Sequence, residues 1–165
     1  MEPVERHHTA TAYIVHEEQT LLLWHKGLGM WLPPGGHCEA NEDPVQAAVR
    51  EAFEESAIAV EVIPPPDLLV CAGPQVLPPP AVILVEDIVR SDQPFHQHID
   101  HVYFTQPLPG ASIGRDIAGT TATWVGPDQL GRPFSLRSPG GSLVQVAEDV
   151  RLLGLRAIAA AVGRY

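Results

Sequence analysis

The chain has 165 residues, 45% of them hydrophobic and 18% charged, and a formal net charge of −10. This length suffices for one domain with a substantial buried core. The acidic balance argues against binding a nucleic-acid polymer, because a phosphate backbone requires a basic surface. A small anionic substrate stays compatible with it, provided that a cation screens the site.

The cysteine content and the N-terminal sequence indicate the compartment. The chain has two cysteines, Cys38 and Cys71, which are too few for a disulfide framework and fit a reducing cytoplasm. The first fifteen residues lack the apolar core of a signal peptide, and no apolar run reaches membrane-spanning length. We therefore expect a cytoplasmic protein without a membrane partner.

The first part of the chain is predicted to form strands and one short helix. Residues 9–18 and 20–26 are rich in β-formers on either side of a polar tip, which indicates a hairpin. Asp43 and Pro44 mark a helix start, because aspartate is a good N-cap and proline suits the first helical position. We expect this helix to end near Ser56.

The rest of the chain is predicted to be mostly strand, with a late helix. A long apolar run at 81–89 is typical of a buried central strand, and the C-terminal helix is expected within 140–165, with a break at Gly154. The other expected strands are 59–63, 67–73, 100–108 and 121–126. No boundary divides the chain, so we expect a single domain, 1–165, of mixed α/β (α+β) class, with helices covering both faces of a mixed sheet.

The early helix carries an unusual cluster of glutamates. Helical periodicity places Glu51, Glu54 and Glu55 on one face and an apolar set on another, namely Val45, Ala48, Val49, Ala52 and Phe53. Like charges three and four residues apart repel each other, and carboxylates near a helix C-terminus oppose its dipole. A divalent ion such as Mg²⁺ or Mn²⁺ would offset both effects. The alternative is a solvated acidic face, because each repulsive pair costs only ~0.2–0.5 kcal/mol.

The spacing around these glutamates carries a family resemblance. Gly36 is followed by five residues and Glu42, then by seven residues and the run Arg50-Glu51-Ala52-Phe53-Glu54-Glu55-Ser56-Ala57-Ile58. This pattern resembles the signature of the Nudix hydrolases at all six of its glycine, glutamate and arginine positions up to Glu55. The similarity extends over about residues 9–130. One position departs from the signature, because Ala57 stands where a glycine would cap the helix in a left-handed conformation.

The resemblance implies both a fold and an activity. It implies a Nudix-type α/β/α sandwich with a central mixed sheet, and a Mg²⁺- or Mn²⁺-dependent hydrolase. Such enzymes cleave the phosphoanhydride of a nucleoside diphosphate linked to a group X and release a nucleoside monophosphate or pyrophosphate. The partner is then a small nucleotide or nucleoside diphosphate derivative, and a homodimer is compatible with the family. The alternative is a non-catalytic nucleotide-binding module on the same fold.

Roles carried over by position follow from the resemblance. The catalytic metal ligands would be Glu51, Glu54 and Glu55, helped by the carbonyl of Gly36. Glu51 is the first candidate for the general base, although family members differ in where the base lies. Glu42 and Arg50 would form a structural ion pair, and a contact between Arg50 and a phosphate is the alternative.

Four further residues are candidates for substrate contact. Trp31 precedes the glycine-rich turn and could form a cleft wall, and Glu39 lies in the loop, where it could also join the metal. His98 and Asp100 share one face of a predicted strand and could line a substrate edge near the phosphates.

The histidine-rich segment 96–101 is also a candidate zinc-binding segment. His96, His98 and His101 with Asp100 have suitable side chains, but His101 points to the other face of the strand. No partner is obvious elsewhere in the sequence, and His7 and His8 read as a polar N-terminal segment. We therefore favour a substrate edge over a zinc site.

Overall fold

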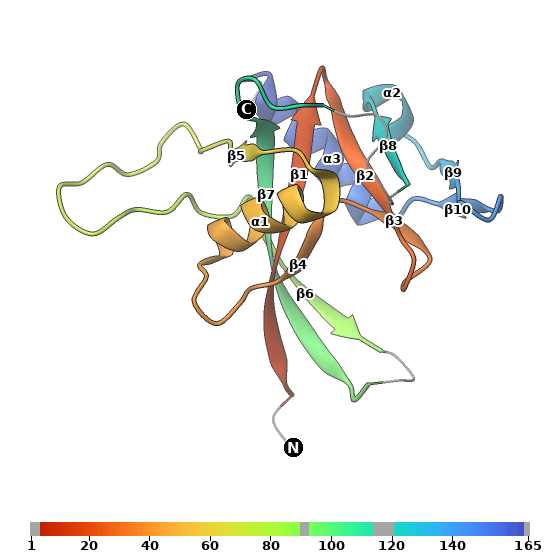
Figure 1. Cartoon of the computed structure of the whole chain (residues 1–165), viewed down its shortest axis with the longest axis horizontal. Helices are drawn as coiled ribbons and strands as arrows, with labels where there is room; N and C mark the ends of the chain where they lie inside the picture. The colour runs from red at the N-terminus through yellow and green to blue at the C-terminus, as the bar shows by residue number, and fades with distance from the viewer. Residues whose placement is uncertain (1–3, 90–92, 114–120, 164–165) are drawn as a thin grey trace.

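The computed structural model describes residues 4–89, 93–113 and 121–163. Its centre is a parallel pair of long strands, β1 (Arg6–His16) and β7 (His96–Pro107), with Arg6 opposite Gln97 and Ile14 opposite Thr105. Both strands are long enough to reach beyond the helices at one end, where they carry β4 and β6 (Figure 1). That projecting end holds the candidate site.

Antiparallel strands extend the central pair on both sides into one mixed sheet. β1 pairs with β2 (Gln19–His25) and β4 (Gly35–His37), and β2 pairs with β3 (Met30–Leu32) and β8 (Ala122–Val125). β7 pairs with β5 (Val60–Val62) and β6 (Val82–Ile88). β9 (Ser135–Arg137) and β10 (Leu143–Gln145) form a separate two-stranded sheet. The predicted β1–β2 hairpin is confirmed, and Glu17 and Glu18 at its tip both have positive φ, as a tight hairpin turn requires.

Helices cover both faces of the sheet, as predicted. α1 (Pro44–Ser56) lies in front in Figure 1 and α3 (Glu148–Ala161) behind, with the short α2 (Pro127–Leu130) beside it. Two hydrophobic clusters fill the layers. Alanines of α1 pack with Ala10, Ala12 and Ile14 of β1 on one face, whereas α3 packs on Tyr13 and Val15 on the other. Because side chains alternate along β1, this single strand serves both cores.

The ends of α1 follow from its sequence. Asp43 accepts hydrogen bonds from the backbone N–H groups of Val45 and Gln46, and the Gln46 side chain accepts from the N–H of Asp43 in return. This capping box satisfies donors that the first helical turn leaves free. At the other end Ala57 adopts the left-handed conformation, with φ 56°. The geometry usually provided by glycine is therefore kept, at a cost of about 1 kcal/mol.

The apolar face of α1 is narrower than predicted. Its buried positions are Ala47, Ala48, Ala52 and Ser56, whereas the Phe53 ring is 55% exposed. The prediction for Phe53 was therefore wrong. Small side chains allow the helix backbone to lie close to the sheet, which leaves no room for a ring at the interface.

Three other predictions differ from the structure, namely the strand at 67–73, the central strand at 81–89 and the extent of the C-terminal helix. Residues 67–73 form no strand, and belong to a long connection between β5 and β6 that prolines interrupt at both ends. β6 is an edge strand that pairs with β7, and its outward Ile83 and Val85 are 55% and 61% exposed, so the central position predicted for 81–89 was wrong.

The predicted C-terminal helix is shorter than expected, because 143–145 form β10. Gly154 lies inside α3 without breaking it. A methyl group there would lie 3.2 Å from side chains of Thr20 and Leu130, so glycine permits close packing. None of the helices in the described ranges has the length and hydrophobicity needed to cross a bilayer.

Candidate active site

A cavity of about 810 Å³ lies on the projecting part of the sheet. Its walls come from β1, β4, β6 and β7, from the end of α1 and from the start of α3. Residues of the predicted signature that reach it are Gly36 and Glu55. The cavity therefore joins the glycine-rich strand β4 to the acidic end of α1.

Arg50 is the centre of the ion-pair network on α1. Its guanidinium donates to both carboxylate oxygens of Glu42, at 2.6 and 2.9 Å, and to the carbonyl of His37 at 3.0 Å. The residues predicted to pair are thus in bidentate contact, which ties the loop after β4 to the helix. These hydrogen bonds lower the pKa of Glu42, so its carboxylate stays ionised.

Arg50 also contacts two of the three helix glutamates. Nη1 donates to Glu51 at 2.8 Å and to Glu54 at 3.2 Å. The Glu51 side chain is 15% exposed and that of Glu54 is 57% exposed, so Glu54 lies at the rim. One guanidinium therefore contacts three carboxylates, and because Glu55 adds a fourth to the cluster, the cluster keeps an excess of negative charge. The solvated acidic face considered above describes Glu54 and does not describe Glu51 or Glu55.

Glu55 projects towards the cavity. Its carboxylate accepts a hydrogen bond from the backbone N–H of Gly35 at 3.1 Å. Burial raises the pKa of Glu55, and the negative charges of Glu51 and Glu54 raise it further. A nearby cation would reverse this effect, because it favours the ionised form.

Gly36 lies directly against Glu51. A methyl group at Gly36 would lie 2.6 Å from Cδ and 2.9 Å from Oε2 of Glu51. No side chain fits at that distance, so the absence of Cβ lets the backbone of β4 approach the carboxylate. The backbone of Gly36 and the carboxylates of α1 form a set of hard oxygen donors, which fits a divalent ion of the Mg²⁺ type.

Four histidines line the same cavity. The rings of His7, His37, His96 and His98 lie close together, with centroids of His7 and His96 4.7 Å apart and those of His37 and His98 4.9 Å apart. Burial, and to a lesser extent the other three rings, lower the pKa of His98 to about 4. The statement that segment 96–101 lacks a histidine partner elsewhere was therefore wrong, because the parallel β1–β7 register places His7 opposite His98.

Asp100 lies deeper on the same strand face. It is 5% exposed and accepts a hydrogen bond from the Thr9 hydroxyl at 3.0 Å. Burial raises the pKa of Asp100. Glu86 on β6 also has a raised pKa, from burial and from the charges of Asp100 and Asp149. Both predicted strand residues, His98 and Asp100, line the cavity.

The other two substrate candidates lie elsewhere. Trp31 is only 3% exposed and belongs to the hydrophobic core, where it packs edge-on against Trp24 with ring centroids 5.6 Å apart. The cleft wall predicted for Trp31 is instead provided by Trp24, which lines the cavity. Glu39 is exposed, and its backbone N–H donates to Glu42.

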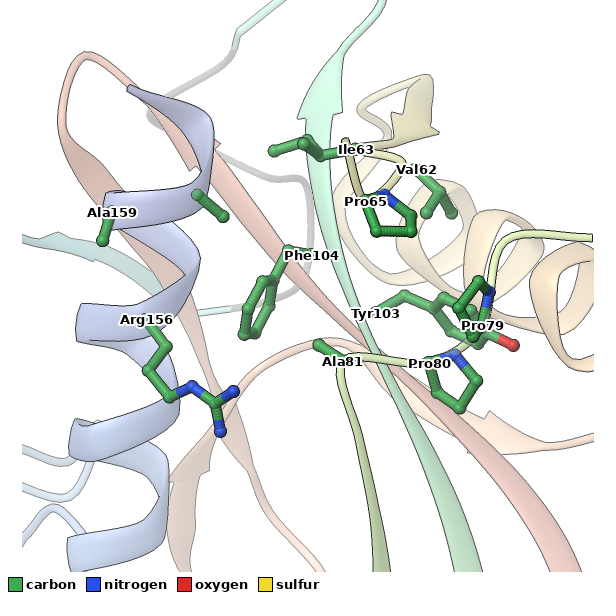
Figure 2. Close-up of a pocket in the computed structure, with 11 residues that line it drawn as sticks. Val62, Ile63, Pro65, Pro79, Pro80, Ala81, Tyr103, Phe104, Arg156 and Ala159 are labelled. Carbon is green, nitrogen blue, oxygen red and sulfur yellow. The ribbon is translucent and has the colours of Figure 1, made fainter. Parts of the chain in front are cut away.

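A smaller cavity of about 430 Å³ lies between the 63–81 connection, β7 and α3 (Figure 2). Prolines 65, 79 and 80, Phe104 and the Arg156 side chain surround it. No residue of the predicted signature lines it. We therefore assign the chemistry to the larger cavity.

Comparison with known proteins defines the class. The sequence model of the NUDIX domain family matches residues 5–145. Phosphatase NudJ of Shigella boydii is 28% identical over 148 residues, covering 87% of this chain and 81% of the relative. The crystal structure of a NUDIX-family hydrolase from Clostridium perfringens is 26% identical, with a TM-score of 0.70 and coverage of 96% and 99% of the two chains. An ADP-ribose pyrophosphatase from Streptococcus suis shares the fold at 15% identity, with a TM-score of 0.51 over 96% and 92% of the chains.

These matches define a hydrolase that acts on anhydrides in phosphorus-containing compounds. The chain belongs to the Nudix family. The predicted mixed-sheet fold is confirmed by the described strands and helices.

Proposed function

We propose that this protein hydrolyses the phosphoanhydride of a nucleoside diphosphate linked to a group X, with Mg²⁺ or Mn²⁺ as cofactor. The observation that carries the proposal is the approach of the Gly36 backbone to the carboxylates of α1 at the edge of a cavity. Residues 1–165 would act as one Nudix domain. The cytoplasmic location, the nucleotide partner and the homodimer predicted above stay predictions.

The metal would be held by Glu51, Glu54 and Glu55 with the carbonyl of Gly36. When bound, it supplies positive charge for the phosphate oxygens and lowers the pKa of a coordinated water. Glu51 and Glu54 accept hydrogen bonds from Arg50. Metal binding would therefore require these Arg50 contacts to change. Exchanging the Arg50 contacts for the ion would be favourable, because a divalent ion carries twice the charge of one guanidinium.

Glu51 is our first candidate for the general base. Its carboxylate lies directly against the Gly36 backbone, which fixes its position. An ionised carboxylate within reach of the attacking water accepts its proton. Glu55 reaches the same space from the next turn of α1 and is the second candidate for this role.

The substrate would occupy the cavity, with the phosphates near Gly36 and Glu55. His98 and Asp100 line the same cavity and would contact the phosphates or the group X. Trp24 offers an aromatic surface for a base or sugar.

A substrate panel tests the activity. Nucleoside triphosphates, dinucleoside polyphosphates and nucleotide sugars are incubated with Mg²⁺ or Mn²⁺, and products are identified by mass. We expect metal-dependent release of a nucleoside monophosphate or pyrophosphate. Glu54→Gln should lower kcat/KM by at least about 100-fold, or ~2.7 kcal/mol, without changing Tm, because the side chain is largely exposed.

Glu61→Gln is the matched control, since Glu61 is an exposed glutamate on β5 whose side chain accepts from Gln106. Its activity should equal that of the wild type. Tight nucleotide binding without turnover on any substrate would instead support the non-catalytic binding module.

A further inference from the structure

We propose that His7, His96 and His98 form a second metal site, distinct from the carboxylates of α1, for a divalent transition-metal ion, with Zn²⁺ as the preferred ion. One ring nitrogen from each histidine lies within 4.8 Å of the others. Among the histidine, cysteine, aspartate and glutamate side chains of the described residues, these three form the group whose ligand atoms already lie this close, whereas the three α1 carboxylates would have to draw together to share an ion. The binding proposal does not depend on the hydrolytic activity.

The trio arises from the parallel pairing of β1 and β7. His7 lies opposite His98 in the register, and His96 precedes His98 by two residues on the same strand face. Ligands on two paired strands have fixed relative positions, because the backbone hydrogen bonds hold both strands. His96 is buried and the other two are half-buried.

The hydrogen bonds of these rings suit metal ligation. Nδ1 of His96 lies 3.0 Å from the carbonyl of Pro94. A carbonyl only accepts, so Nδ1 carries the proton and Nε2 keeps a free lone pair. Nε2 of His7 lies 3.1 Å from a carboxylate oxygen of Glu5, which likewise leaves Nδ1 free. In a metal-bound histidine, the ring nitrogen that does not bind the metal usually donates a hydrogen bond to an oxygen atom.

His98 supplies an independent observation. Its Nε2 is buried and has no hydrogen-bond partner. A buried polar atom without a partner is costly and calls for an explanation, of which an ion is one.

The donor atoms indicate the type of ion. Three imidazole ligands suit Zn²⁺ and similar transition metals, whereas Mg²⁺ prefers oxygen. Zn–N bonds of about 2.0–2.1 Å in a tetrahedral site place the nitrogens roughly 3.4 Å apart. The rings therefore close in by about 1 Å around the ion, which rotation of the half-buried side chains permits. Three protein ligands leave one position open.

The open position faces the same cavity as Gly36 and Glu55. A bound ion would place positive charge in the cavity that Gly36 and Glu55 also line. A phosphate oxygen or a water molecule would fill the open position.

Equilibrium dialysis against Zn²⁺ tests this site. Excess Mg²⁺ is present to occupy the carboxylates, and bound zinc is measured by mass spectrometry. We expect one Zn²⁺ per wild-type chain. His98→Ala and His7→Ala should each weaken zinc affinity by more than the ~10–100-fold that is typical when a residue hydrogen-bonded to a metal ligand is removed. His7→Ala changes a half-buried side chain near the strand end, so its folding is checked by circular dichroism and Tm.

His8→Ala is the matched control, because His8 contacts His101 at 3.0 Å on the opposite face of the same strands. It should bind zinc as the wild type does, and so should the inactive variant Glu54→Gln. Co²⁺ in place of Zn²⁺ should give the visible absorption of a nitrogen-ligated tetrahedral ion, and His98→Ala should abolish it.

The proposal is overturned if the wild type binds no zinc under excess Mg²⁺, or if His7→Ala and His98→Ala bind as much as His8→Ala. Zinc binding that disappears in Glu54→Gln would place the ion at the α1 carboxylates and would also contradict it. Failure of the hydrolase proposal is read separately, from the substrate panel.

Discussion

Gly36→Ala tests how closely β4 approaches the helix carboxylates. The added methyl group would lie 2.6 Å from Cδ of Glu51, where ordinary contacts start at 3.4 Å. The carboxylate must therefore move by about 1 Å, and a shift of this size at a reacting group costs about 100-fold in rate. We expect kcat/KM to fall by that factor, equivalent to ~2.7 kcal/mol, and Mn²⁺ to bind more weakly.

The assay compares kcat/KM on the best substrate of the panel with Mn²⁺ affinity from electron paramagnetic resonance. Gly73→Ala is the matched control, because a methyl group there meets no atom within 4 Å and its φ is not positive. If Gly36→Ala keeps both activity and Mn²⁺ affinity within threefold of the control, the contact between Gly36 and Glu51 does not position the site. The reasoning from the close approach would then be wrong.

Three further substitutions test the surrounding structure. Ala57→Gly should raise the free energy of unfolding by about 1 kcal/mol in urea titrations, because glycine accepts the left-handed cap without strain. Arg50→Gln should lower it by about 2 kcal/mol, since Glu42 and Glu51 lose their donor; an unchanged urea midpoint would contradict this. Asp100→Asn should be more stable than the wild type at pH 7. Because burial raises the folded-state pKa of Asp100, wild-type stability is intact below the unfolded pKa of ~3.9 and falls as pH rises through the folded value. The advantage of Asp100→Asn should therefore vanish below that pH in thermal melts.

The elements with strong local signals could be predicted from the sequence. Asp43-Pro44 defines the start of α1, and the polar tip between two β-rich runs defines the β1–β2 hairpin. The position of a strand within a sheet is a long-range property. The apolar run at 81–89 suggested a central strand, but it lies at an edge, with Ile83 and Val85 in solvent. Composition alone does not report which strands find neighbours.

The candidate site was predictable to the extent that it lies within one helix and its preceding loop. Glu42, Arg50 and the three helix glutamates are close in sequence, so helical periodicity brings them together. The histidine wall depends on a pairing between residues 91 positions apart, His7 and His98. A parallel register is invisible in a single sequence, although the alternation of His98 and Asp100 identified the right strand face.

The charge of the cavity links metal binding to substrate binding. The cavity is lined by four acidic residues, Glu55, Glu86, Asp100 and Asp149. Among the described lining residues, one is a lysine or arginine, namely Lys26. Because a phosphate chain would meet repulsion from these carboxylates, it must enter with a cation or after one has bound. The imidazoles of His7, His96 and His98 would add attraction if they too held an ion. By thermodynamic linkage, the metal and the substrate strengthen each other's binding by the same factor. An acidic protein can thus bind an anion tightly, provided that a cation is bound in the cavity.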